Sequence, residues 1–191
     1  MPRHCTDRSI GLRGPDWIAW RWGLETVPKR LIMGLFLLAW LVGDTAAQAR
    51  TIQATVLSIG DGDTLRVRQG GRTATVRLAC IDAPELAQAP YGQQARRYLQ
   101  QRLRIGAPVT LEIQATDRYG RLVAEVIGEI NIGLALVEDG QAFAYRHYLR
   151  SCDASDYLDA EYRASRHRFG VWQVPGGITR PWDFRRAGAR R

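Results

Sequence analysis

An alternation of apolar and polar residues, broken by short glycine-rich turns, begins at residue 51 and constrains the fold of this 191-residue chain more than any other feature. The first run, TIQATVLSI, contains several β-branched residues, as is typical of a half-buried strand. GDGD at 60–63 interrupts the alternation, and Gly70-Gly71 is a hairpin turn signal. The pattern therefore predicts three consecutive strands, over 51–59, 64–68 and 73–81.

A helical period replaces the alternation after residue 90. Apolar side chains recur at helical spacing at Ala95, Tyr98, Leu99 and Leu103. The sequence Gly106-Ala107-Pro108 ends this helix. Two more strands are predicted at 109–115 and 122–127. Two more helices follow, the first capped by Asn131 and ending before Gly140, the second capped by Ser155 and extending to about Arg168.

Five short strands with interspersed helices fit a small closed barrel of the oligonucleotide-binding (OB) type. The predicted fold class is therefore α+β with mainly β structure, a five-stranded OB-fold barrel with about three helices. Residues 50–173 form the predicted domain. Residues 174–191 form a basic C-terminal extension, and its arginines, such as Arg185 and Arg186, are expected to be solvated.

A short apolar run, LIMGLFLLAWLVG at 31–43, precedes the predicted domain. Its length is below the roughly 20 residues that a bilayer-spanning helix needs. Lys29 and Arg30 stand before it, and Ala47-Gln48-Ala49 after it matches an A-x-A cleavage pattern. We therefore predict that residues 1–49 are a signal peptide cut after Ala49, and that the protein is secreted or periplasmic. The alternative is an uncleaved leader that anchors it to the membrane.

The charge balance belongs to the predicted domain and its extension. The whole chain carries +8, and the first 49 residues hold six basic and four acidic residues, which leaves 21 basic against 15 acidic. Such a basic domain favours a polyanionic partner. Apolar residues at 46% and charged residues at 24% exclude a chain that is disordered throughout.

Cys80 and Cys152 are the two cysteines outside the predicted signal peptide. An even pair in an exported chain favours one disulfide, because an oxidising compartment allows it. Two separate buried thiols are the alternative, since a sequence does not show whether two Cα atoms lie within bonding range.

Three charged segments are candidates for chemistry. DGDT at 61–64 is, on its own, a common turn between strands. In DAPE at 82–85, Pro84 favours an extended backbone at Ala83, so the carboxylates of Asp82 and Glu85 flank a stiff dipeptide. A stiff backbone suits catalytic groups, which must hold their positions closely. DRYGR at 117–121 is, on its own, a solvated hairpin tip.

Taken together and in order, these segments resemble the thermonuclease family, also called staphylococcal nuclease-like. The resemblance covers roughly residues 51–172 and implies the barrel described above. The matching stretches are IGDGDTLRV at 59–67, RLACIDAPE at 77–85, YGQQA at 91–95, TDRYGR at 116–121, NIGLALVEDGQA at 131–142 and GVW at 170–172.

The resemblance implies a calcium site. Asp63 and Asp82 match the calcium-binding carboxylates of the family, and the backbone carbonyl of Ala83 is a further oxygen ligand. Asp61 matches an acidic residue that supports the site electrostatically. Ala83 stands where the best-known members have a threonine, so the rate or the metal affinity is expected to differ from theirs.

The resemblance also implies catalytic and nucleotide-binding residues. Glu85 matches the general base for the attacking water, and Arg77 and Arg121 match the two arginines that grip the phosphate. Tyr119 and Tyr145 fall near the tyrosines that contact the nucleotide. The segment 86–90 is shorter than the corresponding surface loop, which affects the expected substrate preference.

The residue types fit this chemistry on physical grounds as well. Calcium takes oxygen ligands, whereas transition metals favour imidazole or thiolate, and the three histidines of the chain show no ligand spacing. Guanidinium forks suit phosphate oxygens. Arg77 and Asp82 have opposite parity along a strand, so a bend or bulge near 79–81 is needed to bring both to one site.

The sequence thus predicts an exported, calcium-dependent nuclease that hydrolyses DNA and RNA, prefers single-stranded or flexible substrates and acts as a monomer. The resemblance implies 3′-phosphate products. One alternative is a catalytically inactive barrel that only binds nucleic acid, since this fold often does so. Another is an exported structural or adaptor domain without a nucleic acid partner.

Overall fold

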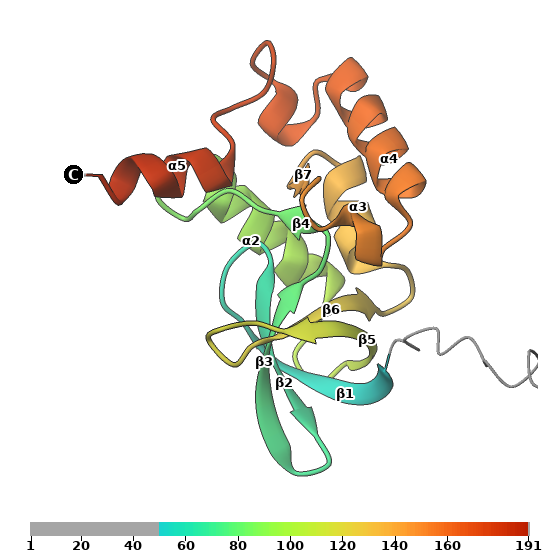
Figure 1. The fold of residues 1–191 in the computed structure, drawn as a ribbon. Helices are drawn as coiled ribbons and strands as arrows, with labels where there is room; N and C mark the ends of the chain where they lie inside the picture. Colours follow the sequence, from blue (N-terminus) through green and yellow to red (C-terminus); the bar gives the residue numbers. More distant parts are fainter. Residues whose placement is uncertain (1–49, 191) are drawn as a thin grey trace, which may run out of the picture. The chain divides into compact units, whose positions relative to one another are not determined.

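Five strands close into a barrel in the order β1-β2-β3-β6-β5 in the computed structural model of this protein, which describes residues 50–190 (Figure 1). Neighbouring strands are antiparallel except β3 and β6, which are parallel. This arrangement confirms the predicted five-stranded barrel. The strands are β1 Arg50–Ile59, β2 Thr64–Gln69, β3 Arg72–Leu78, β5 Pro108–Thr116 and β6 Leu122–Ile127.

The core of the barrel follows from the alternation in the sequence. In β2, Leu65 and Val67 are fully buried while Arg66 and Arg68 are exposed, because successive side chains of a strand point to opposite faces. The other strands contribute apolar side chains to the same core in the same way. Those without exposed surface are Val56, Leu65, Val67, Val76, Leu111, Ala124 and Val126.

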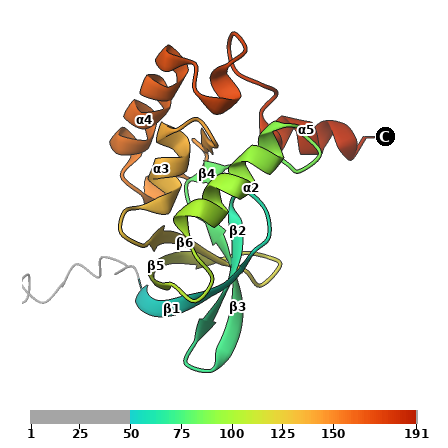
Figure 2. The same ribbon diagram turned by 180° about the vertical axis from the view of Figure 1, so that it is seen from behind.

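The three predicted helices are present as α2 Tyr91–Arg102, α3 Ile132–Glu138 and α4 Ala154–His167. Asn131 caps α3 as predicted, accepting a hydrogen bond from the Leu134 amide at 3.2 Å. The prediction that Ser155 caps α4 is wrong, because the cap is Asp153, two residues earlier, whose carboxylate accepts from the Ser155 amide at 3.1 Å. Both views show α3 and α4 side by side (Figures 1 and 2).

The predicted third strand ends earlier than expected. β3 stops at Leu78, and Cys80 has a positive φ of 64°, a left-handed conformation that cannot continue a strand. The chain then forms a short strand, β4 Ile81–Asp82, which pairs with β7 Phe143–Ala144. The strand prediction is therefore wrong for residues 79 and 80, and the predicted bend near 79–81 is confirmed.

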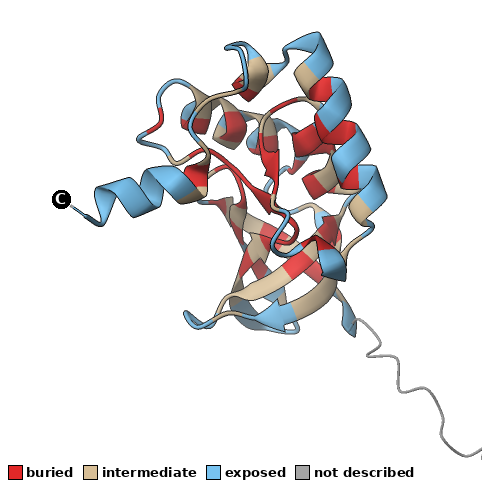
Figure 3. Cartoon of the chain, turned by 45° about the horizontal axis from the view of Figure 1, so that its top comes forward, coloured by how far each residue is buried: buried red, intermediate tan, exposed pale blue. Residues whose placement is uncertain are grey.

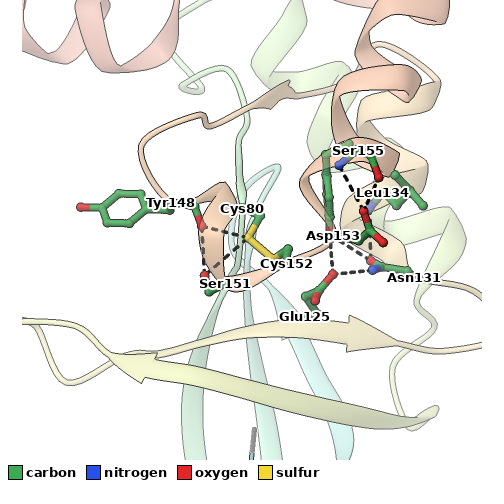
Figure 4. The surroundings of a disulfide bond; sticks show 10 residues. Cys80, Glu125, Asn131, Leu134, Tyr148, Ser151, Cys152, Asp153 and Ser155 are labelled. Atoms are coloured by element: carbon green, nitrogen blue, oxygen red, sulfur yellow. Dashed lines mark hydrogen bonds between the residues drawn. A yellow bond between two sulfur atoms is a disulfide. The ribbon is translucent and has the colours of Figure 1, made fainter. Parts of the chain in front are cut away.

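A disulfide fastens this bend to the helical part of the domain. Cys80 is bonded to Cys152, with their Cα atoms 6.4 Å apart and a sequence separation of 72 (Figure 4). Cys152 directly precedes Asp153, the cap of α4. The cross-link therefore ties the turn that leads into Asp82 to the start of α4.

A fourth helix, α5 Pro181–Gly188, lies in the C-terminal extension, after the short 3₁₀ helices η2 Leu149–Ser151 and η3 Gly170–Trp172. Pro181 opens α5 and is buried, while most of the helix is exposed (Figure 3). None of the helices within residues 50–190 has the length and apolar character to span a bilayer. The predicted signal peptide lies outside the described residues.

Candidate active site

The barrel and the bend bring the first two charged segments together. Asp63 ends the loop between β1 and β2, and the next residue, Thr64, is the register partner of Arg77 in β3. Asp82 follows the bend in β4. Asp63, Arg77 and Asp82, which belong to a loop and two different strands, therefore lie at one place on the outside of the barrel.

Arg77 joins the two aspartates in one ion-pair network. Its Nη1 donates to Asp63 Oδ1 at 2.7 Å, and its Nη2 donates to Asp82 Oδ1. Neither carboxylate has significant exposure to solvent, because the side chain of Asp63 is 4% exposed and that of Asp82 is fully buried. The Ala83 amide donates to Asp63 Oδ2 at 2.8 Å and holds the second carboxylate oxygen. The network is thus rigid and largely removed from water.

Glu85 stands at the open side of this network, with 35% of its side chain exposed. Its backbone is held by Gln88: the Glu85 amide donates to Gln88 Oε1 at 3.0 Å, and the Gln88 amide donates to the Glu85 carbonyl at 2.8 Å. The first turn of α2 presses against the same residue, since a Cβ on Gly92 would lie 2.1 Å from the Glu85 carbonyl oxygen. The position of Glu85 therefore depends on glycine at position 92.

The buried carboxylate of Asp63 has an unusual proton affinity. Burial raises the pKa of Asp63 to about 7; the Arg77 guanidinium opposes this shift, and the charges of Asp61 and Asp82 add to it. Asp61 also accepts a hydrogen bond from the Asp63 amide at 3.1 Å. Asp61 therefore acts on the site both through its charge and by shaping the loop.

This raised pKa predicts how the metal-free protein responds to pH. Between about pH 4 and pH 7 folded Asp63 holds a proton that the unfolded chain has lost, so the free energy of unfolding should fall as the pH rises through this window. With ~1.4 kcal/mol for each tenfold change in proton affinity, the effect is at most about 4 kcal/mol. Urea unfolding at pH 5 and pH 8, with chelator present, should show this loss in the wild type and not in Asp63→Asn. Equal losses in the two proteins would contradict it.

The third charged segment lies close to the network without contacting it. The register pairs Arg77 with Val123, and Arg121, two residues earlier, shares the same face of the sheet. Its Nε donates to Asp117 Oδ2 at 2.7 Å. Tyr119 is 68% exposed, and the guanidinium of Arg121 lies 5.4 Å from its ring centre. Arg121 and Tyr119 are therefore free to meet a ligand bound at Arg77.

Tyr145 lines a pocket on the side of the C-terminal helix. The pocket has a volume of about 430 Å³ and is lined by aromatic and basic side chains: Tyr145, Arg146, His147, Tyr148, Trp182 and Arg186. The ring of Tyr145 stacks on Trp182, with centres 4.9 Å apart and planes 4° from parallel. Sequence analysis places Tyr145 near the nucleotide, and its face toward Trp182 is covered in this structure.

Arg185 of α5 is a site residue that sequence analysis missed. Its Nη2 donates to Asp82 Oδ2 at 2.7 Å and its Nη1 donates to Glu85 Oε1 at 2.6 Å. Although partial burial works against its charge, the hydrogen bonds to Asp82 and Glu85 raise the pKa of Arg185 above its ordinary value. The expectation that this arginine is solvated is therefore wrong. The sequence signal was the spacing of Trp182 and Arg185, which lie on one face of a helix that begins with a proline.

The chemistry of the donor set fits a hard divalent cation. Asp63 and Asp82 offer carboxylate oxygens close to each other, and the Ala83 carbonyl follows directly in the chain. Oxygen donors of this kind suit Ca²⁺ or Mg²⁺. In the described part of the chain, no three or more His, Cys, Asp and Glu side chains are grouped so as to hold a metal. A cation bound here would therefore need backbone or water oxygens beside the two aspartates.

Comparison with known proteins agrees with the fold. Residues 75–174 match the family described as staphylococcal nuclease homologue. The chain is 39% identical over 142 residues to a micrococcal nuclease of Shigella flexneri, covering 69% of this chain and 79% of the relative. It is 35% identical over 164 residues to the protein ParB of Escherichia coli, and this match covers 81% of this chain and 90% of ParB. An uncharacterized endonuclease of Haemophilus influenzae is 35% identical over 146 residues, and this match covers 75% of this chain and 78% of the relative.

The family match covers the second and third charged segments, and the first segment lies beside them in the folded barrel. Family membership and the observed barrel agree with each other. The chain belongs to the staphylococcal nuclease homologue family, and its chemistry is that of a nuclease.

Proposed function

We propose that this nuclease is calcium-dependent and hydrolyses phosphodiester bonds of both DNA and RNA, leaving 3′-phosphate ends. One observation carries the proposal: Arg77 bridges the buried carboxylates Asp63 and Asp82, beside the partly exposed Glu85. A cation site, a phosphate ligand and a proton acceptor thus lie within one cluster.

Each residue of the cluster has a role in this reaction. Asp63, Asp82 and the Ala83 carbonyl would hold the calcium ion, which when bound supplies positive charge next to the phosphate. Glu85 accepts a proton from the attacking water, which can reach its partly exposed carboxylate. The water oxygen bonds to phosphorus while the bond to the 5′-oxygen breaks. The 5′-oxygen takes a proton from solvent water and leaves as a 5′-hydroxyl, and Glu85 later returns its proton to solvent.

Arg77 and Arg121 would stabilise the charge that builds on the phosphate oxygens. Arg77 is already fixed by its two aspartate partners, so it needs little reorganisation when the reaction proceeds. Arg121 shares its face of the sheet and is held at its Nε by Asp117, which leaves its two Nη groups for a ligand. Planar guanidinium groups match phosphate oxygens in a bidentate manner.

The substrate range follows from the groups that the site offers. The guanidinium groups would contact the phosphate, which DNA and RNA share, and the carboxylates would act at the same phosphate through the cation and the attacking water. Contacts to the phosphate carry no sequence information. Tyr119 is exposed beside Arg121, and its aromatic ring can contact an unpaired base. This supports a preference for single-stranded or flexible substrates, with Tyr145 as a second nucleotide contact. We propose that the enzyme acts as a monomer.

We also propose that the protein is exported, into the periplasm or the medium. The basis is the apolar run at 31–43 with its A-x-A pattern in the sequence. The disulfide between Cys80 and Cys152 supports the proposal, because such bonds persist in oxidising compartments.

Analysis of the reaction products tests the proposed reaction. The purified protein would be incubated with a DNA and an RNA oligonucleotide of matching sequence, with Ca²⁺ or with excess chelator. We expect both to be cut with Ca²⁺, at many positions, into fragments that carry a 3′-phosphate and a 5′-hydroxyl. Fragments with 5′-phosphate ends would contradict the proposed direction of cleavage, and cutting of one polymer alone would contradict the proposed range.

Gly92 provides a test of the position of Glu85. In Gly92→Ala the new Cβ would meet the Glu85 carbonyl oxygen at 2.1 Å and the Glu85 carbonyl carbon at 2.6 Å, so the backbone of Glu85 must move. A displacement of ~1 Å in a catalytic group costs about 10²-fold in rate. We expect such a loss of calcium-dependent cleavage, measured as an initial rate.

Gly128→Ala is the matched control for this variant. A Cβ on Gly128 would make only ordinary contacts, 3.6 Å from Leu103 and 3.8 Å from Ile132. Its cleavage rate should stay near that of the wild type. Equal rates in Gly92→Ala and Gly128→Ala would show that the close approach of α2 does not position Glu85.

A further inference from the structure

The guanidinium of Arg185 occupies the space between the carboxylates of Asp82 and Glu85. Its Nη1 lies 3.1 Å from Asp82 Oδ1 and 2.6 Å from Glu85 Oε1, and its Nη2 lies 2.7 Å from Asp82 Oδ2. Asp82 Oδ1 also accepts from Arg77. Both oxygens of Asp82 are thus engaged by guanidinium groups, and Glu85 is held by the same group.

Other contacts fix the start of α5 independently of this ion pair. Pro181 is buried, and Trp182 stacks on Tyr145 with ring centres 4.9 Å apart. The Arg180 guanidinium lies 4.1 Å from the ring centre of Phe143, and the Thr179 carbonyl accepts from Gln88 Nε2 at 2.8 Å. The packed start of the helix therefore positions Arg185 next to the carboxylates.

The charges of the cluster indicate that Arg185 occupies the place of a cation at Asp82. Three carboxylates, Asp63, Asp82 and Glu85, contact two guanidinium groups, Arg77 and Arg185, which leaves one negative charge. Without Arg185 the same cluster has three carboxylates and one guanidinium, or two negative charges. A cation on Asp82 needs lone pairs that Arg185 now uses, so the two positive groups compete for the same oxygens.

We propose that Arg185 is a residue of the nuclease site that the cation displaces, and that it thereby sets the cation affinity of the enzyme. In the metal-free protein it neutralises Asp82 and Glu85. Cation binding moves the guanidinium away, which frees Asp82 as a ligand and Glu85 as a proton acceptor. This inference rests on the proposed function, because it takes Asp82 as a ligand of the cation and Glu85 as the base.

Calorimetric titration of the purified protein with CaCl₂, without nucleic acid, tests this competition. Arg185→Gln removes the guanidinium and should bind Ca²⁺ between about 5- and 150-fold more tightly than the wild type, the typical range of coupling between two binding events. Arg186→Gln is the matched control, since Arg186 is the next residue, carries the same charge and pairs with Asp183 at 3.6 Å. Its Ca²⁺ affinity should change by less than about threefold, as expected for a screened surface charge.

A conservative variant keeps the proposal testable if Arg185→Gln does not fold. Arg185→Lys keeps the charge but lacks the fork that spans Asp82 and Glu85, so its Ca²⁺ affinity should lie between those of the wild type and Arg185→Gln. An affinity in either folded variant equal to or below that of the wild type overturns the competition.

The wild type separates this inference from the function on which it rests. If the wild type cleaves DNA with Ca²⁺ but neither variant binds Ca²⁺ more tightly, the role of Arg185 is wrong and the nuclease function stands. If the wild type neither binds Ca²⁺ nor cleaves DNA, the calcium-dependent function fails and the role of Arg185 fails with it.

Discussion

Replacing Glu85 by glutamine is expected to lower the rate of calcium-dependent cleavage by about 10²–10⁴-fold, the usual contribution of a general base. Glutamine keeps the size and the hydrogen-bonding capacity of the side chain but cannot take a proton from water. The carboxylate is partly exposed and lies next to buried Asp82, where an attacking water can reach it. Single-turnover rates with saturating Ca²⁺ and a labelled single-stranded DNA would measure the loss.

Nucleic acid binding should survive this change, because the phosphate ligands Arg77 and Arg121 remain. Glu129→Gln is the matched control: it makes the same chemical change at an exposed position between β6 and α3. It should cleave at the wild-type rate. A Glu85→Gln protein that cleaves as fast as Glu129→Gln would remove Glu85 from the reaction.

Replacing Arg77 by glutamine is expected to damage both activity and stability. It removes a preorganised partner of the phosphate, a change that costs about 10²–10³-fold in rate at comparable sites. It also leaves Asp63 buried without its counter-charge. Breaking a buried pair on one side costs about 3–5 kcal/mol, and we expect ~3 kcal/mol because Arg185 still contacts Asp82.

Urea unfolding and initial cleavage rates would measure these two effects of Arg77→Gln. Arg102→Gln is the control, since it breaks an ion pair with Asp139 whose side chains are 44% and 43% exposed. Such a surface pair is worth at most about 1 kcal/mol. Equal stabilities of Arg77→Gln and Arg102→Gln would show that the network around Arg77 does not hold the fold together.

The barrel was predictable from the sequence because its strands are half buried. Alternation, together with the turns at 60–63 and 70–71, placed β1 and β2 within one residue of their observed ends. The bend at 79–81 followed from the opposite parity of Arg77 and Asp82, once the family resemblance placed both residues at one site. Helix α3 followed from its cap, Asn131. The strands and the helix cap are local features, so the sequence around each one contains the physical cause.

The role of α5 was not predictable in the same way. Most of this helix is exposed, so it lacks the apolar stripe that reveals a packed helix. Arg185 reaches Asp82 because Trp182 stacks on Tyr145 and Pro181 is buried, and these contacts join segments that are far apart in the chain. The pairing of the two-residue strands β4 and β7 was missed for the same reason, since two residues show no periodicity.

The most direct test of the nuclease mechanism is the rate at which the purified protein cuts a long single-stranded DNA, with Ca²⁺ and then with excess chelator. The arrangement of Asp63, Asp82 and Glu85 around Arg77 predicts cleavage that requires Ca²⁺, stops when chelator is added and resumes when Ca²⁺ is restored. Salt-sensitive binding without cleavage would contradict this mechanism and leave a barrel that only binds nucleic acid. Cleavage that continues in chelator would contradict the calcium requirement.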